Sequence, residues 1–301
     1  MWFDPAVVET TRDAFPEWTA FLFALLSYFG SVWFVAPAVV VAYWFYDRYR
    51  FGPWLGIAMG GYALMLGVKS LFGVSRPGVG PAIAPADLPT VVAVLYAPLV
   101  EVDTSSFPSG HALAAVVIWG MIVRESDVGT FRTRLAGSGL VVVLVAFSRV
   151  TVGVHYPVDV VVGVAVGLVY LLGALIVVDR LGRDDLERGT VAFALAAVLA
   201  VGAFVVSSEP EAAALVGGSL GALTAWRGLS PPRTPWPRAP KGVAFALTGL
   251  ASLGLVALVI TILEVPAVMV AVGFVSSSLV VGFPALTTAV RTTGRSTEAV
   301  G

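Results

Sequence analysis

Long apolar runs recur along the whole of this 301-residue chain, and they limit its fold more than any other feature. A helix needs about 20 apolar residues to cross the ~30 Å hydrocarbon core of a bilayer, and most of the runs approach or exceed that length. A backbone surrounded by lipid must satisfy its own hydrogen bonds, which a helix does within one segment. The sequence therefore predicts an all-α, polytopic transmembrane helix bundle of about nine spans, at residues 18–45, 53–72, 110–123, 135–152, 158–178, 190–206, 212–226, 242–263 and 266–290.

The composition agrees with a membrane protein and excludes several other classes. Charged residues make up 12% of the chain, against roughly a quarter in soluble domains. The chain has no cysteine, which excludes disulfides, thiolate nucleophiles and zinc–thiolate sites. The net charge of −1 gives no indication of a nucleic-acid partner. The N-terminus lacks a basic stretch followed by a short apolar core, so we expect no cleaved signal peptide.

A charged stretch at residues 179–188 is the best candidate for a boundary between two modules. The first module, residues 1–185, would be a five-span membrane-embedded core with a Gly- and Pro-rich connection at residues 73–107. The apolar piece of this connection, residues 90–100, is too short to cross a membrane, so we expect a lid or an interfacial segment. Residues 1–17 are expected to form an interfacial helix. The second module, residues 186–301, would hold four spans and a polar cytoplasmic tail, and serve helix packing or homodimerisation.

The distribution of basic residues predicts how the chain is oriented in the plasma membrane. With nine spans, one side of the membrane carries four of the 18 lysines and arginines, and the other side carries fourteen. Because cytoplasmic loops are enriched in these residues, the N-terminus is expected outside and the C-terminus in the cytoplasm. The outer cations are Arg12, Lys69, Arg76 and Arg149. The last three lie in polar clusters, where a functional role explains them better than snorkelling at helix ends.

Two polar clusters on this expected outer face follow the second span. Lys69 and Arg76 are seven residues apart, so two helical turns would place them on one side. Further along, Ser109, Gly110 and His111 begin the third span. Ser109 is a good helix N-cap, and the free N–H groups of a helix N-terminus form a natural site for an anion.

A third cluster surrounds the turn between the fourth and fifth spans. It contains Arg149, His155 and Asp159, and His155 and His111 are the two histidines of the chain. Pro157 can begin the fifth helix, because a proline in the first turn removes no helical hydrogen bond. We therefore expect this polar run to lie on the same face as the other two clusters.

Together the clusters gather three cations, a helix N-terminus, two histidines and one carboxylate, a set that suits a phosphate dianion. Phosphoryl transfer is catalysed mainly by positioning and by stabilising charge on the phosphate oxygens. Metal ions often do this, but Asp159 is the one acidic residue in the clusters, so we expect the cations to do it and no metal or other cofactor to bind. One histidine could attack phosphorus while the other protonates the leaving oxygen. Asp159, four residues after His155, could hold the imidazole in the required tautomer.

The three clusters, in this order and without substitution, resemble the three-part signature of the type 2 phosphatidic acid phosphatase superfamily. Its members are integral-membrane lipid phosphatases, with soluble relatives. The resemblance implies that His155 is the nucleophile that forms a phosphohistidine. It further implies that His111 is the general acid and later the base for water, that Asp159 orients His155, and that no metal takes part. The phosphate oxygens would be bound by Lys69, Arg76, Ser109, Gly110 and Arg149.

The resemblance covers about residues 18–178 and departs from the family pattern in two ways. Many membrane members carry the first motif after a third span, whereas here it follows the second, and residues 186–301 have no counterpart. The expected activity is hydrolysis of a lipid-linked phosphate at the outer face, with a polyprenyl phosphate or diphosphate as first choice. Phosphatidylglycerol phosphate, phosphatidic acid and phosphoryl transfer to another acceptor are the enzymatic alternatives. A transporter or scaffold that kept the site is the non-enzymatic alternative.

Overall fold

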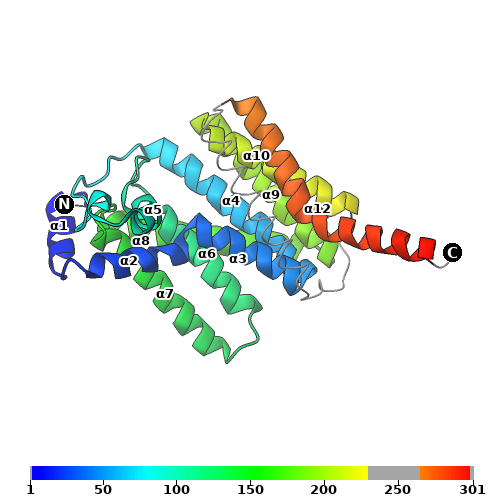
Figure 1. The fold of residues 1–301 in the computed structure, drawn as a ribbon, viewed down its shortest axis with the longest axis horizontal. Helices are drawn as coiled ribbons and strands as arrows, with labels where there is room; N and C mark the ends of the chain where they lie inside the picture. Colours follow the sequence, from blue (N-terminus) through cyan, green and yellow to red (C-terminus); the bar gives the residue numbers. More distant parts are fainter. Residues whose placement is uncertain (1, 230–264, 299–301) are drawn as a thin grey trace. The chain divides into compact units, whose positions relative to one another are not determined.

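The computed structural model describes residues 2–229 and 265–298, and every regular element in those ranges is helical (Figure 1). The predicted all-α class is therefore confirmed. In chain order the helices are α1 (Pro5–Asp13), α2 (Thr19–Ser27), η1 (Tyr28–Gly30), α3 (Val32–Phe45), α4 (Arg48–Phe72), η2 (Pro85–Asp87), α5 (Thr90–Val100), α6 (Gly110–Glu125), α7 (Phe131–Thr151), α8 (Pro157–Leu181), α9 (Asp185–Ser207), α10 (Pro210–Leu229) and α12 (Pro266–Glu298).

Four of the described helices, α4, α7, α8 and α9, are long and apolar enough to cross a membrane. A fifth span results if the pair of helices over residues 19–45, which is bent by 44°, crosses as one unit. The chain is thus a multi-pass membrane protein. The apolar run predicted at residues 242–263 lies outside the described residues.

The first predicted span, residues 18–45, is not one continuous helix. It breaks after η1, where Ser31 has extended backbone angles (φ −81°, ψ 147°). A Cβ atom on Gly30 would overlap the backbone carbonyl of His111, so glycine at this break allows it to approach the start of α6 closely. The indole Nε1 of Trp119 on α6 donates to the carbonyl of Phe29 (3.1 Å) beside the break. Hydropathy shows the apolar run but not the tertiary contact that interrupts it.

Two helix starts near the polar clusters are those predicted. The Ser109 hydroxyl accepts the N–H of Ala112 (3.5 Å) and caps α6. Pro157 is the first residue of α8. The apolar piece of the connection at 73–107 forms the short helix α5, whose position relative to a membrane stays a prediction.

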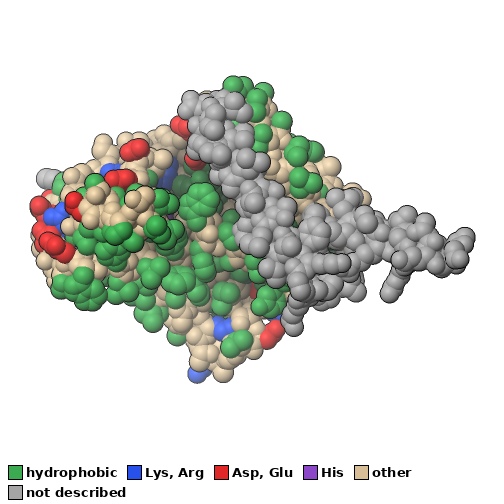
Figure 2. All heavy atoms as spheres, viewed as in Figure 1, with side chains coloured by type: hydrophobic (Ala, Val, Ile, Leu, Met, Phe, Trp, Pro, Cys, Tyr) green, Lys and Arg blue, Asp and Glu red, His purple; other side chains and the backbone are tan. Residues whose placement is uncertain are grey.

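The helices group into two compact units. Unit 1 comprises Met1–Ala36 and Met65–Leu172, and unit 2 comprises Pro37–Leu64 and Gly173–Gly301. The sequence-based division into residues 1–185 and 186–301 is a different grouping and stays a prediction. In unit 1, Figure 2 shows hydrophobic side chains covering the visible surface between charged groups at α1 and at the loop that joins α6 to α7. An apolar band between two charged ends is the surface expected of a membrane-embedded bundle.

Unit 2 is held together by close helix packing. Helix α10 lies between α9 and α12 (Figure 1). A Cβ atom on Gly217 of α10 would overlap the Val270 carbonyl of α12, so the two backbones approach as closely as glycine allows. On the other side, the fully buried Trp226 donates from its indole Nε1 to the carbonyl of Leu186 on α9 (2.8 Å).

Candidate active site

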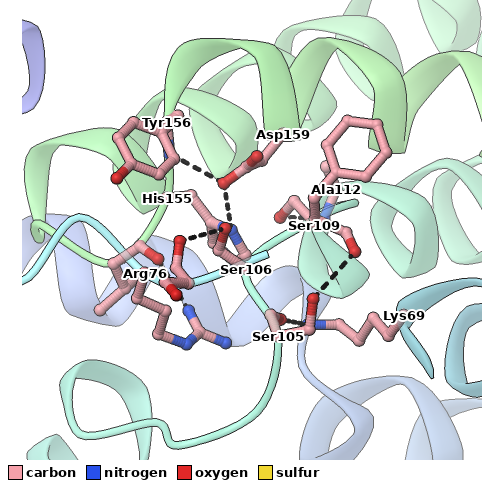
Figure 3. Close-up of polar contacts among 12 residues, drawn as sticks. Lys69, Arg76, Ser105, Ser106, Ser109, Ala112, His155, Tyr156 and Asp159 are labelled. Carbon is pink, nitrogen blue, oxygen red and sulfur yellow. Dashed lines mark hydrogen bonds and ion pairs between the residues drawn. The ribbon is translucent and has the colours of Figure 1, made fainter. Parts of the chain in front are cut away.

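The residues of the three polar clusters all belong to unit 1 and come from the ends of several helices. Figure 3 shows five of them close together: Lys69, Arg76, Ser109, His155 and Asp159. Lys69 is in the last turn of α4, and Arg149 is in the last turn of α7. His155 lies in the turn between α7 and α8, and Asp159 is in the first turn of α8. The segment that contains His111 opens α6. Helix ends from distant parts of the sequence therefore supply the candidate residues.

His155 and Asp159 form a buried pair. Nδ1 of His155 lies 3.2 Å from Oδ2 of Asp159, and the same oxygen accepts the backbone N–H of Tyr156 (2.9 Å). The two side chains are 2% and 0% exposed, so water does not compete for this contact. When Nδ1–H donates to the carboxylate, Nε2 carries the lone pair of the imidazole and is the nitrogen available for chemistry.

A backbone hydrogen bond joins the second cluster to the third. The N–H of Ser109 donates to the carbonyl of Asp159 (2.9 Å), and Ser109 is fully buried. The start of α6, which carries His111, is therefore fixed against the first turn of α8, which carries the carboxylate. Gly110 begins α6 and faces the side chain of Met65 on α4. The first N–H groups of α6 have no partner within the helix, as at any helix N-terminus.

Arg149 is the most buried cation of the site. Its side chain is 1% exposed, and its Nε and Nη1 atoms have no hydrogen-bond partner among the described residues. Nε2 of the half-buried His111 is likewise buried without a partner there. A buried guanidinium with unused donors is costly, and its planar fork matches the oxygens of a phosphate. These donors would suit a bound anion.

Lys69 and Arg76 are both attached to the segment at residues 104–105. Nζ of Lys69 donates to the carbonyl of Ser105. Nε of Arg76 donates to the carbonyl of Thr104 (2.8 Å), and its Nη1 donates to the carbonyl of Val154 (2.7 Å), next to His155. Burial lowers the pKa of Arg76 to about 10, with Asp159 opposing the shift, so its guanidinium stays charged at neutral pH.

The expected reason for the pairing of Lys69 and Arg76 was wrong, although the two residues do lie close together in the structure. Helix α4 ends at Phe72, so Arg76 is beyond the helix and two helical turns do not connect it to Lys69. The two side chains meet instead on consecutive residues of another segment, Thr104 and Ser105. Tertiary structure, not helical periodicity, brings them together.

The segment at residues 104–106 is a part of the site that the sequence did not single out. The N–H of Ser106 donates to the carbonyl of Val74 (2.8 Å), and its hydroxyl donates to the carbonyl of Ser75 (3.2 Å), so the segment runs along residues 74–76. Ser106 is fully buried and lies close to the carboxylate of Asp159 (Figure 3). The available signal was a run of small hydroxyl residues directly before the second cluster.

The electrostatics of His155 show how closely the cations converge. Burial, and then the positive charges of Arg149, Arg76 and Lys69, hold the pKa of His155 well below its usual range. The imidazole is therefore neutral at physiological pH, which keeps its Nε2 lone pair available.

The described residues contain no group of three or more His, Cys, Asp or Glu side chains that could hold a metal ion.

The fold and the site together define a class: a multi-pass membrane protein with a buried, cation-lined anion site and a histidine–carboxylate pair. Residues 50–183 of the chain match the PAP2 superfamily, whose members are membrane lipid phosphate phosphatases. Every candidate residue of the three clusters lies within the matched segment.

Two individual proteins are similar to parts of the chain. Phosphatidylglycerophosphatase B of Bacillus subtilis (strain 168) is 35% identical over 79 residues, which are 24% of this chain. In that comparison the chain spans 39% of the length of the relative. The crystal structure of LpxE from Aquifex aeolicus is similar with a TM-score of 0.43 and 21% sequence identity, over 57% of this chain and 94% of the other.

Proposed function

We propose that this protein hydrolyses a lipid-linked phosphate monoester or diphosphate through a phosphohistidine on His155. The observation that carries the proposal is the juxtaposition of a buried histidine–carboxylate pair with the buried Arg149, whose Nε and Nη1 lack partners among the described residues. The match of residues 50–183 to the PAP2 superfamily supports it. A phosphate group would supply the acceptors that these donors lack.

In the proposed first step, Nε2 of His155 attacks phosphorus and the bond to the leaving oxygen breaks. Asp159 holds Nδ1–H and stabilises the positive charge that develops on the ring. His111 donates its proton to the leaving oxygen, so the dephosphorylated product leaves neutral at that atom. Lys69, Arg76, Arg149, the Ser109 hydroxyl and the N–H of Gly110 bind the three equatorial oxygens, whose charge they offset without a metal.

In the proposed second step, water attacks the phosphohistidine. His111, now neutral, accepts the proton of that water, the bond between Nε2 and phosphorus breaks, and inorganic phosphate leaves. If an acceptor alcohol took the place of water, the same site would transfer the phosphoryl group, so hydrolysis and transfer differ in the second step alone.

We propose a polyprenyl phosphate or diphosphate as substrate, because an outward-facing site in a membrane protein suits a lipid carrier released during glycan assembly. The name of the Bacillus subtilis relative favours phosphatidylglycerol phosphate as the second candidate, with phosphatidic acid beside it. All of these candidates carry a phosphate group, so the proposed phosphate-binding residues do not distinguish between them. A transporter or scaffold is the alternative in which no phosphate would be released.

The proposal includes a topology of nine spans, with the active site and the N-terminus outside and the C-terminus in the cytoplasm. The excess of basic residues in the loops predicted to be cytoplasmic supports it. Residues 1–185 would form the phosphatase domain, and residues 186–301 would serve packing or a homodimer. Cysteine residues introduced at positions 103 and 183 of this cysteine-free chain would react with an impermeant maleimide from opposite sides of the membrane.

The direct test is phosphate release by the purified protein from a panel of polyprenyl and glycerolipid phosphates, with EDTA present. We expect release with EDTA and none from the His155→Ala variant. Strong inhibition by EDTA would contradict the metal-free mechanism, and full activity of His155→Ala would contradict the phosphohistidine. Labelled phosphate appearing on an added alcohol, and not as free phosphate, would replace hydrolysis by transfer.

A further inference from the structure

The N-terminal segment, residues 2–13, lies directly against the candidate active site. The ring of Phe3 packs edge-to-face on Tyr156 (5.3 Å between ring centroids) and on Phe107 (6.0 Å). Tyr156 follows His155, and Phe107 precedes the second cluster. At the other end of α1, Nη1 of Arg12 donates to the carbonyl of Val79 (2.8 Å) in the connection after α4. The segment is thus attached to the site at both of its ends.

A groove lies between this segment and the first turns of α8. It has a volume of about 260 Å³, and its walls are formed by Trp2, Asp4, Val7, Pro157, Val158 and Val161. Asp4 is the one charged residue of the lining, and its Oδ1 accepts the N–H of Ala6 (3.0 Å) as the N-cap of α1. The remaining lining residues are apolar, so the groove suits a hydrocarbon and not a second polar group.

The groove begins beside the chemistry and ends at an apolar exposed surface. Pro157 and Val158 stand between His155 and Asp159 in the chain. Further along α8, Val161 is 66% exposed, and Trp2 on the facing wall is 79% exposed. Because α8 is a candidate membrane span, exposed apolar residues on it face hydrocarbon in the bilayer. The groove therefore lies next to the turn that carries His155, on an apolar surface that would face lipid.

We propose that this groove holds the part of the substrate's hydrocarbon chain that adjoins the phosphate, with residues 2–7 as one wall. The inference rests on the proposed function, because it assigns a place to the lipid whose phosphate His155 attacks. Small-molecule pockets are typically roughly 300–1,000 Å³, so a groove of about 260 Å³ fits the first carbons of one chain and not a whole lipid. The distal part of the chain stays in the bilayer.

The test places a tryptophan on either wall of the groove and measures how activity depends on the length of the substrate's alkyl chain. The substrates are butyl phosphate and octyl phosphate, and the readout is the ratio of their kcat/KM values. Each methylene that enters an apolar groove from water is worth roughly a fourfold gain in kcat/KM. We expect Val161→Trp and Val7→Trp to lower the octyl-to-butyl ratio by about tenfold or more. Because the readout is a ratio, a partial loss of folded protein cancels.

Val169→Trp is the matched control, because Val169 is an exposed valine (74%) two turns further along α8 that does not line the groove. It should keep the wild-type ratio. The inference is overturned if both groove variants keep the wild-type ratio, or if Val169→Trp lowers it equally.

A second measurement separates failure of this inference from failure of the proposed function. An alkyl phosphate with a terminal diazirine is photolysed on the His155→Ala variant, which binds without turnover, and the labelled peptides are identified. Labelling within residues 2–7 or 157–161 supports the groove even if the wild-type protein releases no phosphate from any substrate. Labelling confined to other residues excludes the groove even if the wild type is an active phosphatase.

Discussion

The two compact units bury very different side chains. Almost all buried polar side chains of the described residues lie in unit 1, including Arg149, His155 and Asp159, while Arg48 and Ser219 are those of unit 2. The other buried side chains of unit 2 are apolar or aromatic, from alanines to Phe193 and Trp226, with helices in backbone contact at Gly217. Polar groups buried without partners cost stability, whereas close packing contributes to it. The difference suggests that unit 1 is arranged for chemistry at the expense of stability, and unit 2 for stability.

A substitution at His155 should have the largest effect and most directly tests whether unit 1 is arranged for chemistry. The His155→Gln variant keeps an amide donor for Asp159 but no nucleophile. We expect phosphate release to fall by about 10⁴-fold, the order of loss seen when a catalytic group of a triad is disabled. The thermal midpoint should stay close to that of the wild type, because the buried hydrogen bond to the carboxylate can persist. Substantial residual turnover would show that His155 is not the nucleophile.

A substitution at Arg149 should lower the activity and raise the stability of the protein. Arg149→Met fills a similar volume and removes a buried charge whose Nε and Nη1 lack partners among the described residues. Loss of one charge-stabilising group typically costs about 10²–10³ in kcat, and replacing a buried ion by an apolar residue can stabilise by about 1–3 kcal/mol. Turnover should fall while the thermal midpoint rises. A fall in both would mean that Arg149 also supports the fold of unit 1.

The pH dependence of kcat/KM tests the same cluster of charges. Burial and the neighbouring cations hold the pKa of His155 well below its usual range, so the neutral nucleophile persists as the pH falls. The acid limb of the profile, which reports the free enzyme, should therefore lie below about pH 6.5, the ordinary value for histidine. In Arg149→Met one opposing charge is gone, and the limb should move to higher pH. An acid limb above pH 6.5 in the wild type would contradict the geometry of the cluster.

The smallest expected effect comes from unit 2, where a substitution should change stability and spare turnover. In Gly217→Ala the added methyl meets the Val270 backbone carbonyl, and overpacking of this kind costs about 1–3 kcal/mol. Gly228→Ala is the control, because a methyl there meets no atom within 4 Å. Thermal unfolding should distinguish the two variants, and turnover per folded molecule should be unchanged in both. Loss of turnover in Gly217→Ala would show that the activity of unit 1 depends on the helix packing of unit 2.

Much of the helical architecture could be predicted because hydropathy and capping act locally. The apolar runs gave the helices, and Ser109 and Pro157 marked two starts that the structure confirms. The break at Gly30 could not be predicted, because it depends on the close approach of the His111 carbonyl, a contact between residues far apart in the chain. The count of nine spans went beyond the four or five that the described helices support.

The candidate site was predictable as a set of residues but not as a set of contacts. The four-residue spacing suggested that Asp159 could hold the imidazole of His155, and the two side chains do meet at the start of α8. Spacing misattributed the meeting of Lys69 and Arg76, which depends on Thr104 and Ser105 in a separate segment. A loop whose backbone carbonyls accept hydrogen bonds leaves little trace in residue type, so its part in the site emerges from coordinates alone.

The hydrogen bond from the Ser109 N–H to the Asp159 carbonyl has a consequence for mutational scanning. It sets the spacing between the helix that carries His111 and the one that carries the carboxylate, yet every residue except proline can form it. Alanine scanning at either position will therefore leave this contact intact and will report only the roles of the side chains, the Ser109 hydroxyl and the Asp159 carboxylate. Replacing the amide at Ser109 by an ester would expose its contribution, because the donor disappears while the side chain remains.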